Sequence, residues 1–523
     1  MYFPNLRTLD ASVAFHAGRR PDHPAVLCEG RTVTYGELHR RSNRLGHALR
    51  AAGASERARV AYLGKESEHY YEVLFACAKT GTILVPINWR LTVGEVDHIL
   101  RDSRTEVLFV EEEFRALAEK AIAALADRVQ VVVVDRDGDA GAGILGWAAG
   151  HPDTDLDRTA HEDDPVAQLY TSGTTGLPKG VVLAHRSFFA VRDALASEGL
   201  SWIDWREGDV SLIGIPGFHV GGLWWATQGF NAGVTNVALR MFISGEAVRQ
   251  IRQLGITTAC VVPSMLQMVL SEPDAADEDF ASLRKVVYGG SPISERLLEQ
   301  AVERIGCDFA QIYGLTETGN TAVCLPPHEH VVGGPRMQAA GRPYPGFEVK
   351  IVDRDGNRLR GRAVGEVCLR TPAHMIEYWG LPEATASTLV DGWIMTGDAG
   401  YLDEEGYLFV CDRIKDAIIV AGENVYPAEI ENALAKHEAV LESAVIGVPD
   451  ERWGEAVRAF VVLRPGTTAT PRELMMSLKG RIADFKIPTG YEFIDTLPRN
   501  PSGKILRREL RDRFWQGQQR KVN

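Results

Sequence analysis

Short apolar strands, Gly-rich turns and amphipathic helices alternate along most of this chain, and this alternation sets its class of fold. The stretch "KVVYGGSPISERLLEQAVERIG" (285–306) predicts a buried strand, a Gly-Gly-Ser-Pro turn and a helix. The apolar residues of that helix share one face: Leu297, Leu298, Ala301, Val302 and Ile305. The same order occurs between residues 58 and 88, where "SEHYYEVLFACAKTG" predicts a helix that ends at Gly81. Such alternation is typical of parallel sheets covered by helices, in which ligands bind at the carboxyl ends of the strands.

The length and one change of pattern predict two domains. A chain of 523 residues is too long for one ordinary domain. The charged stretch "CDRIKD" (411–416) follows a predicted hairpin whose turn contains Glu404, Glu405 and Gly406. After it the chain reads strand, helix, strand, strand, helix, strand. We therefore predict an α/β protein with a large N-terminal domain of parallel sheets flanked by helices (1–412) and a small α+β C-terminal domain (413–523).

Composition excludes several classes of protein. The 57 Lys and Arg residues against 70 Asp and Glu give a net charge of -13, which argues against a nucleic-acid-binding protein. The 7 cysteines form no CxxC pair, so we expect small core residues in a reducing compartment. The start "MYFPNLRTLD" does not resemble a signal peptide, and no run of about 18 apolar residues predicts a membrane span. We expect a cytoplasmic protein without integral membrane contact, and leave open whether it forms a homodimer.

The stretch "TSGTTGLPKG" (171–180) follows the apolar residues "VAQLY" and is a candidate phosphate-binding loop. Backbone N–H groups at glycine can approach phosphate oxygens without a Cβ clash, and hydroxyls and a lysine add donors and charge. The residues concerned are Thr171, Ser172, Gly173, Thr174, Thr175 and Lys179. The spacing is not that of a Walker A loop. From these residues alone, a surface loop is an equal alternative.

Three further motifs each have a plain structural alternative. "YGLTETGN", from Tyr313, places a hydroxyl beside a carboxylate that could bind Mg²⁺, but in isolation such a stretch is more often a solvated helix cap. "GWIMTGD" ends in Asp398, which could accept from ribose hydroxyls or simply belong to a turn. "PRNPSGK" places Lys504 in a Pro- and Gly-containing turn within a basic chain end, where a lysine is usually only a surface charge.

Taken together and in this order, the motifs closely resemble those of the ANL superfamily of adenylate-forming enzymes. The set is "TSGTTGLPKG", "YGLTE", "TGD", "DRIKD", "GENVYP" and "PRNPSGK", and the resemblance extends from "TYGEL" (34–38) to Lys504. This superfamily includes acyl-CoA synthetases, aryl-CoA ligases, luciferases and adenylation domains. The resemblance implies ATP and Mg²⁺ as cofactors, CoA as co-substrate, and a mobile C-terminal domain that rotates between two half-reactions.

The resemblance also implies roles for individual residues. The loop at 171–180 would hold the β- and γ-phosphates of ATP, Thr316 would contact the α-phosphate, and Glu317 would bind Mg²⁺. Lys415 would be the hinge, Lys504 would bridge the carboxylate and the nucleotide, and Gly422 would border the pantetheine tunnel, although Ala421 replaces the glycine of many members. The remaining nucleotide contacts would be Gly289, Gly290, Ser291, Pro292, Gln311, Tyr313, Gly314, Asp398 and Arg413.

The side of the site that binds the acid is less specific. Amino-acid-activating relatives usually carry Asp where this chain has His219, so an α-amino acid is disfavoured, and in CoA ligases this His lies beside the acyl carbonyl. We expect the side chains of Trp224 and Trp225 to pack in the core and not to line the pocket. Segments that border the pocket in relatives contain no Lys or Arg, so we expect an apolar pocket. Their residues are Val262, Ser264, Tyr288, Leu315 and Asn320.

The favoured function is an AMP-forming acid–CoA ligase. It would form acyl-AMP and pyrophosphate from a small-molecule carboxylic acid and ATP, and then transfer the acyl group to CoA. Because the barrier to joining two anions is largely electrostatic, a cation and a lysine are the expected catalysts. One alternative is transfer to a carrier protein or to a small nitrogen or oxygen nucleophile. Another is a catalytically silent nucleotide-binding or scaffold protein, which Glu317, Asp398 and Lys504 disfavour.

Overall fold

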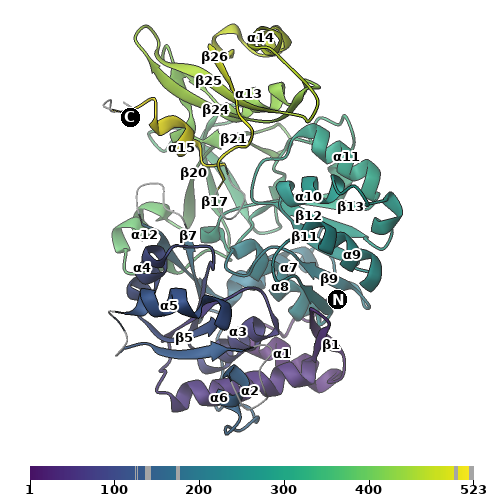
Figure 1. Ribbon diagram of the computed structural model, residues 1–523, viewed down its shortest axis with the longest axis vertical. Helices are drawn as coiled ribbons and strands as arrows, with labels where there is room; N and C mark the ends of the chain where they lie inside the picture. Colours follow the sequence, from purple (N-terminus) through teal and green to yellow (C-terminus); the bar gives the residue numbers. More distant parts are fainter. Residues whose placement is uncertain (124, 126–127, 136–142, 172–176, 500–504, 517–523) are drawn as a thin grey trace.

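The computed structural model describes residues 1–123, 125, 128–135, 143–171, 177–499 and 505–516. Its three N-terminal sheets form one body, and a fourth sheet with its helices caps this body at the top of Figure 1. The large N-terminal part is therefore mixed α/β and the C-terminal part is smaller, as the alternation of strands and helices predicts.

One N-terminal sheet has nine strands, six of which are neighbours in parallel. Its strand order is β15 (Arg342–Pro343), β14 (Val323–Leu325), β13 (Asp308–Tyr313), β12 (Lys285–Gly289), β11 (Thr258–Val261), β9 (Val210–Ile213), β10 (Thr235–Ala238), β1 (Pro24–Cys28) and β2 (Arg31–Thr34). Helices α9 (Ser244–Leu254), α10 (Pro263–Leu270) and α11 (Glu295–Ile305) lie along its outer side (Figure 1).

A second sheet has seven strands, and its central part is again parallel. Its order is β18 (Glu377–Tyr378), β8 (Lys179–Ala184), β7 (Pro165–Thr171), β4 (Ile83–Ile87), β3 (Arg59–Leu63), β5 (Thr105–Glu111) and β6 (Gln130–Val134). Associated helices include α2 (Tyr35–Ala51), α3 (Glu68–Thr80), α4 (Val93–Ser103), α5 (Arg115–Ile122) and α6 (Gly143–Ala148). Helix α3 ends at Gly81, whose φ of 76° satisfies the left-handed C-cap that glycine favours.

The third N-terminal sheet is antiparallel, a component that the parallel pattern of the sequence did not include. It consists of β16 (Glu348–Val352), β17 (Gly365–Arg370), β20 (Trp393–Leu402) and β19 (Leu389–Val390), with β21 (Leu408–Arg413) paired to β20. Strands β20 and β21 form the predicted hairpin around Glu404–Gly406. Their alternation of residue types is short and local, which is why the hairpin was predictable and the rest of the sheet was not.

The C-terminal sheet follows directly. It consists of β23 (Glu423–Val425), β22 (Ile418–Val420), β25 (Gly454–Leu463) and β24 (Val440–Asp450), with β26 (Gly490–Phe493) parallel to β25. Helices α13 (Pro427–Leu434), α14 (Pro471–Leu478) and α15 (Arg507–Asp512) accompany it. The ion pair between Lys436 Nζ and Glu295 Oε2, 3.0 Å apart, links this part to α11. The boundary at 412/413 stays a prediction.

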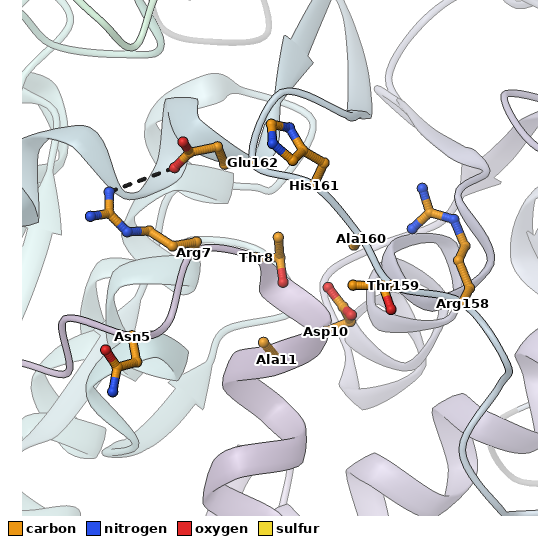
Figure 2. A pocket seen from close by; sticks show the side chains of 10 residues that line it. All are labelled: Asn5, Arg7, Thr8, Asp10, Ala11, Arg158, Thr159, Ala160, His161 and Glu162. Carbon is orange, nitrogen blue, oxygen red and sulfur yellow. Dashed lines mark ion pairs between the residues drawn. The ribbon is translucent and has the colours of Figure 1, made fainter.

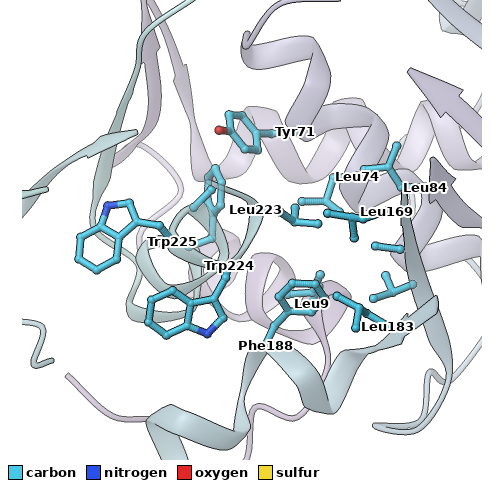
Figure 3. Packing of buried hydrophobic residues seen from close by; sticks show 14 of the residues in the cluster. Leu9, Tyr71, Leu74, Leu84, Leu169, Leu183, Phe188, Leu223, Trp224 and Trp225 are labelled. Carbon is cyan, nitrogen blue, oxygen red and sulfur yellow. The ribbon is translucent and has the colours of Figure 1, made fainter. Parts of the chain in front are cut away.

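The main core lies between the nine- and seven-stranded sheets, where α1 (Leu9–Arg19), α3 and α8 (Val220–Ala232) are packed. Trp224 and Trp225 of α8 are 1% and 2% exposed and lie in this cluster (Figure 3), which confirms the core prediction for both. Of the cysteines, Cys307 and Cys411 are half-buried and the other five are buried, and none of the seven forms a disulfide within the described part of the chain. Among the described residues, no helix combines the length and the apolar composition needed to span a membrane.

Candidate functional site

Three sheets contribute to the predicted motifs, two of them at the ends of strands and the third through the β20–β21 hairpin. Thr171 ends β7 and pairs with Lys179, the first residue of β8. The short helix Thr316–Thr318 follows β13 after Gly314, and Asp398 on β20 faces Arg413 on β21. Thr171, Lys179 and Arg413 are strand ends and Thr316–Thr318 is an adjacent turn, whereas Asp398 lies within β20, so side chains from distant segments can meet there.

A first group joins the candidate phosphate side. The Tyr378 hydroxyl donates to Glu317 Oε1 at 2.6 Å, and Lys179 Nζ lies 5.0 Å from the centre of the Tyr378 ring. Tyr378 reaches both because β18 pairs with β8. Burial, and then the charge of Glu317, raise the pKa of Tyr378, so this phenol stays protonated and donates to the carboxylate. The arrangement places one cation and one anion around an aromatic ring.

A second group surrounds Asp398, which is 5% exposed. Tyr313 donates its hydroxyl to Asp398 Oδ2 at 2.7 Å, and Arg413 Nε lies 2.7 Å from Oδ1. The backbone N–H of Asp398 donates to Thr396 Oγ1 at 3.0 Å. Each carboxylate oxygen has a partner and retains further acceptor capacity. This fixed carboxylate is suited to accept hydrogen bonds from a diol.

A third group lies along β12 and β13. The Tyr288 hydroxyl donates to Gln311 Oε1 at 3.0 Å and lies 3.1 Å from His330 Nε2. Burial lowers the pKa of His330 to about 4, so its ring is neutral near pH 7. Gly289 needs its lack of a side chain, because a Cβ there would lie 2.3 Å from the Ile312 carbonyl oxygen. Gly290, with a φ of 83°, then turns the chain, and Ser291 and Pro292 are exposed.

Two buried polar atoms lie near the start of α8. His219 is its N-cap, and its Nε2 is inaccessible and has no hydrogen-bond partner among the described residues. Burial, and then the charge of Arg90, lower the pKa of His219 to about 4. Asn320, held at a φ of 94°, has an Nδ2 without a hydrogen-bond partner in the described part of the chain, and its Oδ1 would lie 3.6 Å from a Cβ at Gly221. The start of α8 therefore adjoins the loop that carries Glu317.

Several predicted residues lie elsewhere or outside the described part. Ser172, Gly173, Thr174, Thr175 and Lys504 fall outside the described residues. Lys415 lies in the short helix Ile414–Asp416, and Gly422 lies in the turn between β22 and β23 with a φ of 89°. Ala421 before it also has a positive φ, 52°, a conformation in which glycine is favoured.

Sequence reasoning did not identify Tyr378 or His330. Each belongs to a segment without a recognisable motif, and each reaches the site through a partner far away in the sequence. The only local signal for either residue was composition: Tyr378 lies between Glu377 and Trp379, and His330 belongs to "PHEHVVGG". Arg90, whose charge acts on His219, was also missed, since it lies outside the segments used to predict an apolar pocket.

A surface hollow of about 580 Å³ lies away from these groups, between the start of α1 and residues 158–162 (Figure 2). Arg7 Nη1 lies 3.6 Å from Glu162 Oε2, and Arg158 Nη2 lies 2.6 Å from Asp164 Oδ2. Its lining includes none of the motif residues. We therefore do not assign the nucleotide site to this hollow.

Comparison with known proteins gives matches over nearly the whole chain. Residues 13–379 match the AMP-binding enzyme family, and residues 429–504 match the AMP-binding enzyme C-terminal domain. The fatty acid–[acyl-carrier-protein] ligase ScoC of Streptomyces coeruleorubidus is 64% identical over 100% of this chain and 99% of its own length. The indoleacetate–CoA ligase of Aromatoleum aromaticum is 38% identical, over 95% of this chain and 96% of its own.

Solved structures of similar proteins agree. The anthranilate–CoA ligase AuaEII in complex with anthranoyl-AMP has a TM-score of 0.88 at 27% identity, over 98% of both chains. The o-succinylbenzoate–CoA synthetase MenE of Bacillus subtilis, in complex with its acyl-adenylate intermediate, has a TM-score of 0.83 at 31% identity, over 95% of this chain and 97% of its own. With two family matches and relatives of this similarity, the chain belongs to the ANL superfamily of adenylate-forming enzymes, as a ligase that activates a carboxylic acid for transfer to CoA or to a carrier protein.

Proposed function

We propose that this enzyme activates a fatty acid with ATP and transfers the acyl group to the phosphopantetheine thiol of an acyl carrier protein. The observation that carries the proposal is the 64% identity, over the whole length of both chains, to a fatty acid–[acyl-carrier-protein] ligase. The sequence motifs favour CoA as acceptor, with a carrier protein as the alternative. The degree and extent of this identity favour the alternative.

The nucleotide would bind between the second and third groups of residues. Asp398 would accept hydrogen bonds from both ribose hydroxyls, while Tyr313 and Arg413 hold its carboxylate in place. Gln311 and the Gly289–Pro292 turn would border adenine. The contact between Tyr288 and Gln311 supports this, because it fixes the amide of Gln311 through its oxygen. Gly314 keeps the following turn tight, since a Cβ there would lie 2.5 Å from the Asn320 carbonyl oxygen.

The phosphates would lie between Lys179, Thr316 and Glu317. Glu317 fits a Mg²⁺ ligand because it is a carboxylate fixed by Tyr378 beside a threonine hydroxyl. The described residues hold no cluster of three or more potential metal ligands, so most of the coordination would come from ATP phosphates and water, as is usual for Mg²⁺. When bound, the ion would offset phosphate charge.

In the first half-reaction, an oxygen of the substrate carboxylate attacks the α-phosphorus, and the bond to pyrophosphate breaks. Lys179 and Lys504 would offset the charge that makes this approach unfavourable. His219 is neutral near pH 7, so it would act as a hydrogen-bonding group beside the acid without adding charge. In the second half-reaction, the thiol attacks the acyl carbon and AMP leaves. Rotation at Lys415 would remove Lys504 and bring Gly422 toward the thiol.

The test compares acceptors directly. The purified enzyme is given Mg²⁺, ATP and fatty acids of several chain lengths, with a holo carrier protein, the same protein without phosphopantetheine, or CoA. Intact-mass measurement should show one acyl group on the holo protein and none on the apo protein. Faster formation of acyl-CoA than of acyl carrier protein at equal acceptor concentration would contradict the proposed acceptor.

CoA remains the second candidate acceptor. The observation that favours it is the identity of 38% to an indoleacetate–CoA ligase over nearly the whole chain. The same experiment distinguishes the two, because both products are weighed in parallel. A panel that includes aryl acids also tests the substrate class, since an aryl acid turned over faster than every fatty acid would contradict the fatty-acid assignment.

A further inference from the structure

A buried carboxylate holds the loop that precedes His219. Glu66, between β3 and α3, is 4% exposed. Its Oε2 accepts the backbone N–H of Gly217 at 2.9 Å, and its Oε1 accepts the Tyr71 hydroxyl. Tyr70 donates its hydroxyl to the Gly217 carbonyl at 2.9 Å. One short segment thus binds the polar groups on both sides of the Gly217 Cα, so it restrains the loop at that point.

The loop depends on these bonds because it is buried. Residues 214–219 connect β9 to α8, and Gly217 lies in neither element. An unpaired buried N–H carries the desolvation cost of that group without a compensating bond, so loss of its acceptor should shift the loop. Gly217 is also packed tightly, since a Cβ there would lie 2.5 Å from the Tyr70 hydroxyl oxygen. In Figure 3 the Tyr71 hydroxyl points away from Leu74 and Leu84, in keeping with its role in this polar group.

The geometry transmits the position of Gly217 to His219. The backbone N–H of His219 donates to the Pro216 carbonyl at 3.0 Å, which closes a turn around Gly217. The Phe218 and His219 rings lie 4.6 Å apart. The buried Nε2 of His219, without a partner in the described part of the chain, is therefore held by a short turn whose centre is fixed by Glu66.

Glu66 is itself fixed to both large sheets. Arg240, two residues after the end of β10, donates through Nη1 to the Glu66 carbonyl at 3.3 Å. The same guanidinium binds both oxygens of Glu111, at 2.5 and 2.9 Å, and Glu111 ends β5. Such a bidentate pair fixes orientation as well as distance. The His219 loop thus takes its position from strands of the nine- and the seven-stranded sheet.

We propose that Glu66 is a positioning residue for the carboxylic acid site, which acts through Gly217 to hold His219 Nε2 toward the acid. This rests on the proposed function of the same site, in which His219 borders the acid. It goes beyond that function because it assigns Glu66 to the binding of the carboxylic acid and not to the binding of ATP. The nucleotide groups around Asp398 and Gln311 belong to other elements, so they should not depend on Glu66.

The test measures pyrophosphate release while the acid and ATP are varied separately. Glu66→Ala should raise KM for the acid, or lower kcat/KM for it, by about tenfold, the size expected for one buried hydrogen bond. KM for ATP should change less than about twofold. Glu66→Gln keeps an acceptor for Gly217 and should stay within about threefold of wild type. Should Glu66→Ala fail to fold, Tyr70→Phe removes the other bond to Gly217 and should change the acid parameters in the same direction.

Glu72 offers a matched control. It is a fully buried carboxylate on α3 whose hydrogen bonds and ion pairs, among the described residues, go to His69 and Arg41 and not to residues 214–219. Glu72→Ala should lower Tm while KM for the acid stays unchanged. An equal rise in acid KM in Glu72→Ala, or an equal rise in ATP KM in Glu66→Ala, would reduce Glu66 to a structural residue and overturn the proposal.

A double-mutant cycle tests the route through His219. In the His219→Ala background, Glu66→Ala should change the acid kcat/KM by less than about twofold, because the group that it positions is gone. A full additional tenfold loss would overturn the proposal. The assay uses whichever acid wild type activates fastest and requires no acceptor. A wrong fatty-acid or carrier-protein assignment would therefore leave this comparison intact.

Discussion

At the scale of single residues, the site consists of charged groups held by tyrosines. Tyr378 binds Glu317 and lies under Lys179, and Tyr313 binds Asp398. A phenol fixes a carboxylate without neutralising it, because it donates a hydrogen bond while staying uncharged. The carboxylate oxygens therefore keep acceptor capacity for a cation or a ribose diol.

Replacement of Glu317 by Gln tests the metal side of the proposal. The change removes the anionic oxygens but keeps the size, so we expect the rate of pyrophosphate release to fall about 10- to 100-fold at limiting Mg²⁺. Excess Mg²⁺ should restore part of it. Tyr378→Phe, which keeps the carboxylate and removes its 2.6 Å hydrogen bond, should have the smaller effect. Unchanged kinetics with unchanged Mg²⁺ dependence would remove Glu317 from the site.

Lys504 lies outside the described residues, and its role is tested by separating the half-reactions. Loss of a preorganised charged donor typically costs about 10²–10³ in rate, so Lys504→Ala should slow adenylation by that factor. Transfer from chemically supplied acyl-AMP should be spared. Lys479→Ala, an exposed lysine elsewhere in the C-terminal part, serves as the control. Equal slowing of both half-reactions by Lys504→Ala would contradict a step-specific role.

At the scale of elements, the chain passes from one sheet to the next between β21 and β22. Strand β21 still belongs to the N-terminal sheet and carries Arg413, while β22 begins the C-terminal sheet. The residues between them form the short helix Ile414–Asp416 and Ala417. A connection this short concentrates any rotation of the C-terminal part on a few backbone dihedrals, which is why we place the hinge at Lys415.

Proline at position 415 tests this hinge. It fixes φ near -65° and restricts the residue before it, so it should resist rotation. Pyrophosphate release should continue in Lys415→Pro if the adenylation orientation is retained, while acyl transfer from supplied acyl-AMP should fall at least about tenfold. Lys415→Ala, which leaves the backbone unrestricted, should retain both activities. Parallel loss of both half-reactions in the proline variant would indicate misfolding and contradict the hinge.

At the scale of the whole molecule, stability should depend on histidines buried in the neutral form. Burial lowers the pKa of His16, His39, His185, His219 and His330 to about 4, from an ordinary value of 6.5. The unfolded chain takes up protons near pH 6.5 and the folded protein only near pH 4, so this stability is complete above pH 6.5 and lost as pH falls toward 4. Burial also raises the pKa of Glu66 to about 7 and of Asp412 to about 6, which acts in the opposite direction.

Five histidines lose stability as the pH falls and two carboxyls gain it, so the histidines contribute more to the pH dependence of the free energy of unfolding. We therefore expect Tm to fall when the pH is lowered from 7.5 to 5. His185 is the best single residue with which to test this pH dependence. It is 1% exposed, and its Nδ1 accepts the Leu9 backbone N–H at 3.1 Å. His185→Asn keeps an acceptor near that position and removes the titrating group. The fall in Tm between the two pH values should be smaller in this variant. An unchanged fall would exclude His185 from the acid sensitivity of the protein.

The sequence alone determined what depends on local chemistry. The strand and helix between Lys285 and Ile305, the Gly81 cap and the β20–β21 hairpin follow from apolar periodicity and turn residues. The superfamily follows from the order of short motifs, several of which lie in strand ends and turns.

Tertiary structure alone decided which side chains meet. Tyr378 and Glu317 are 61 residues apart, Tyr313 and Asp398 are 85 apart, and Glu66 and Gly217 are 151 apart. These pairs depend on how β18 joins β8, how the hairpin of β20 and β21 reaches β13, and how the two large sheets pack. No periodicity within one segment encodes such contacts, because sheet packing buries many residues together and fixes their neighbours collectively.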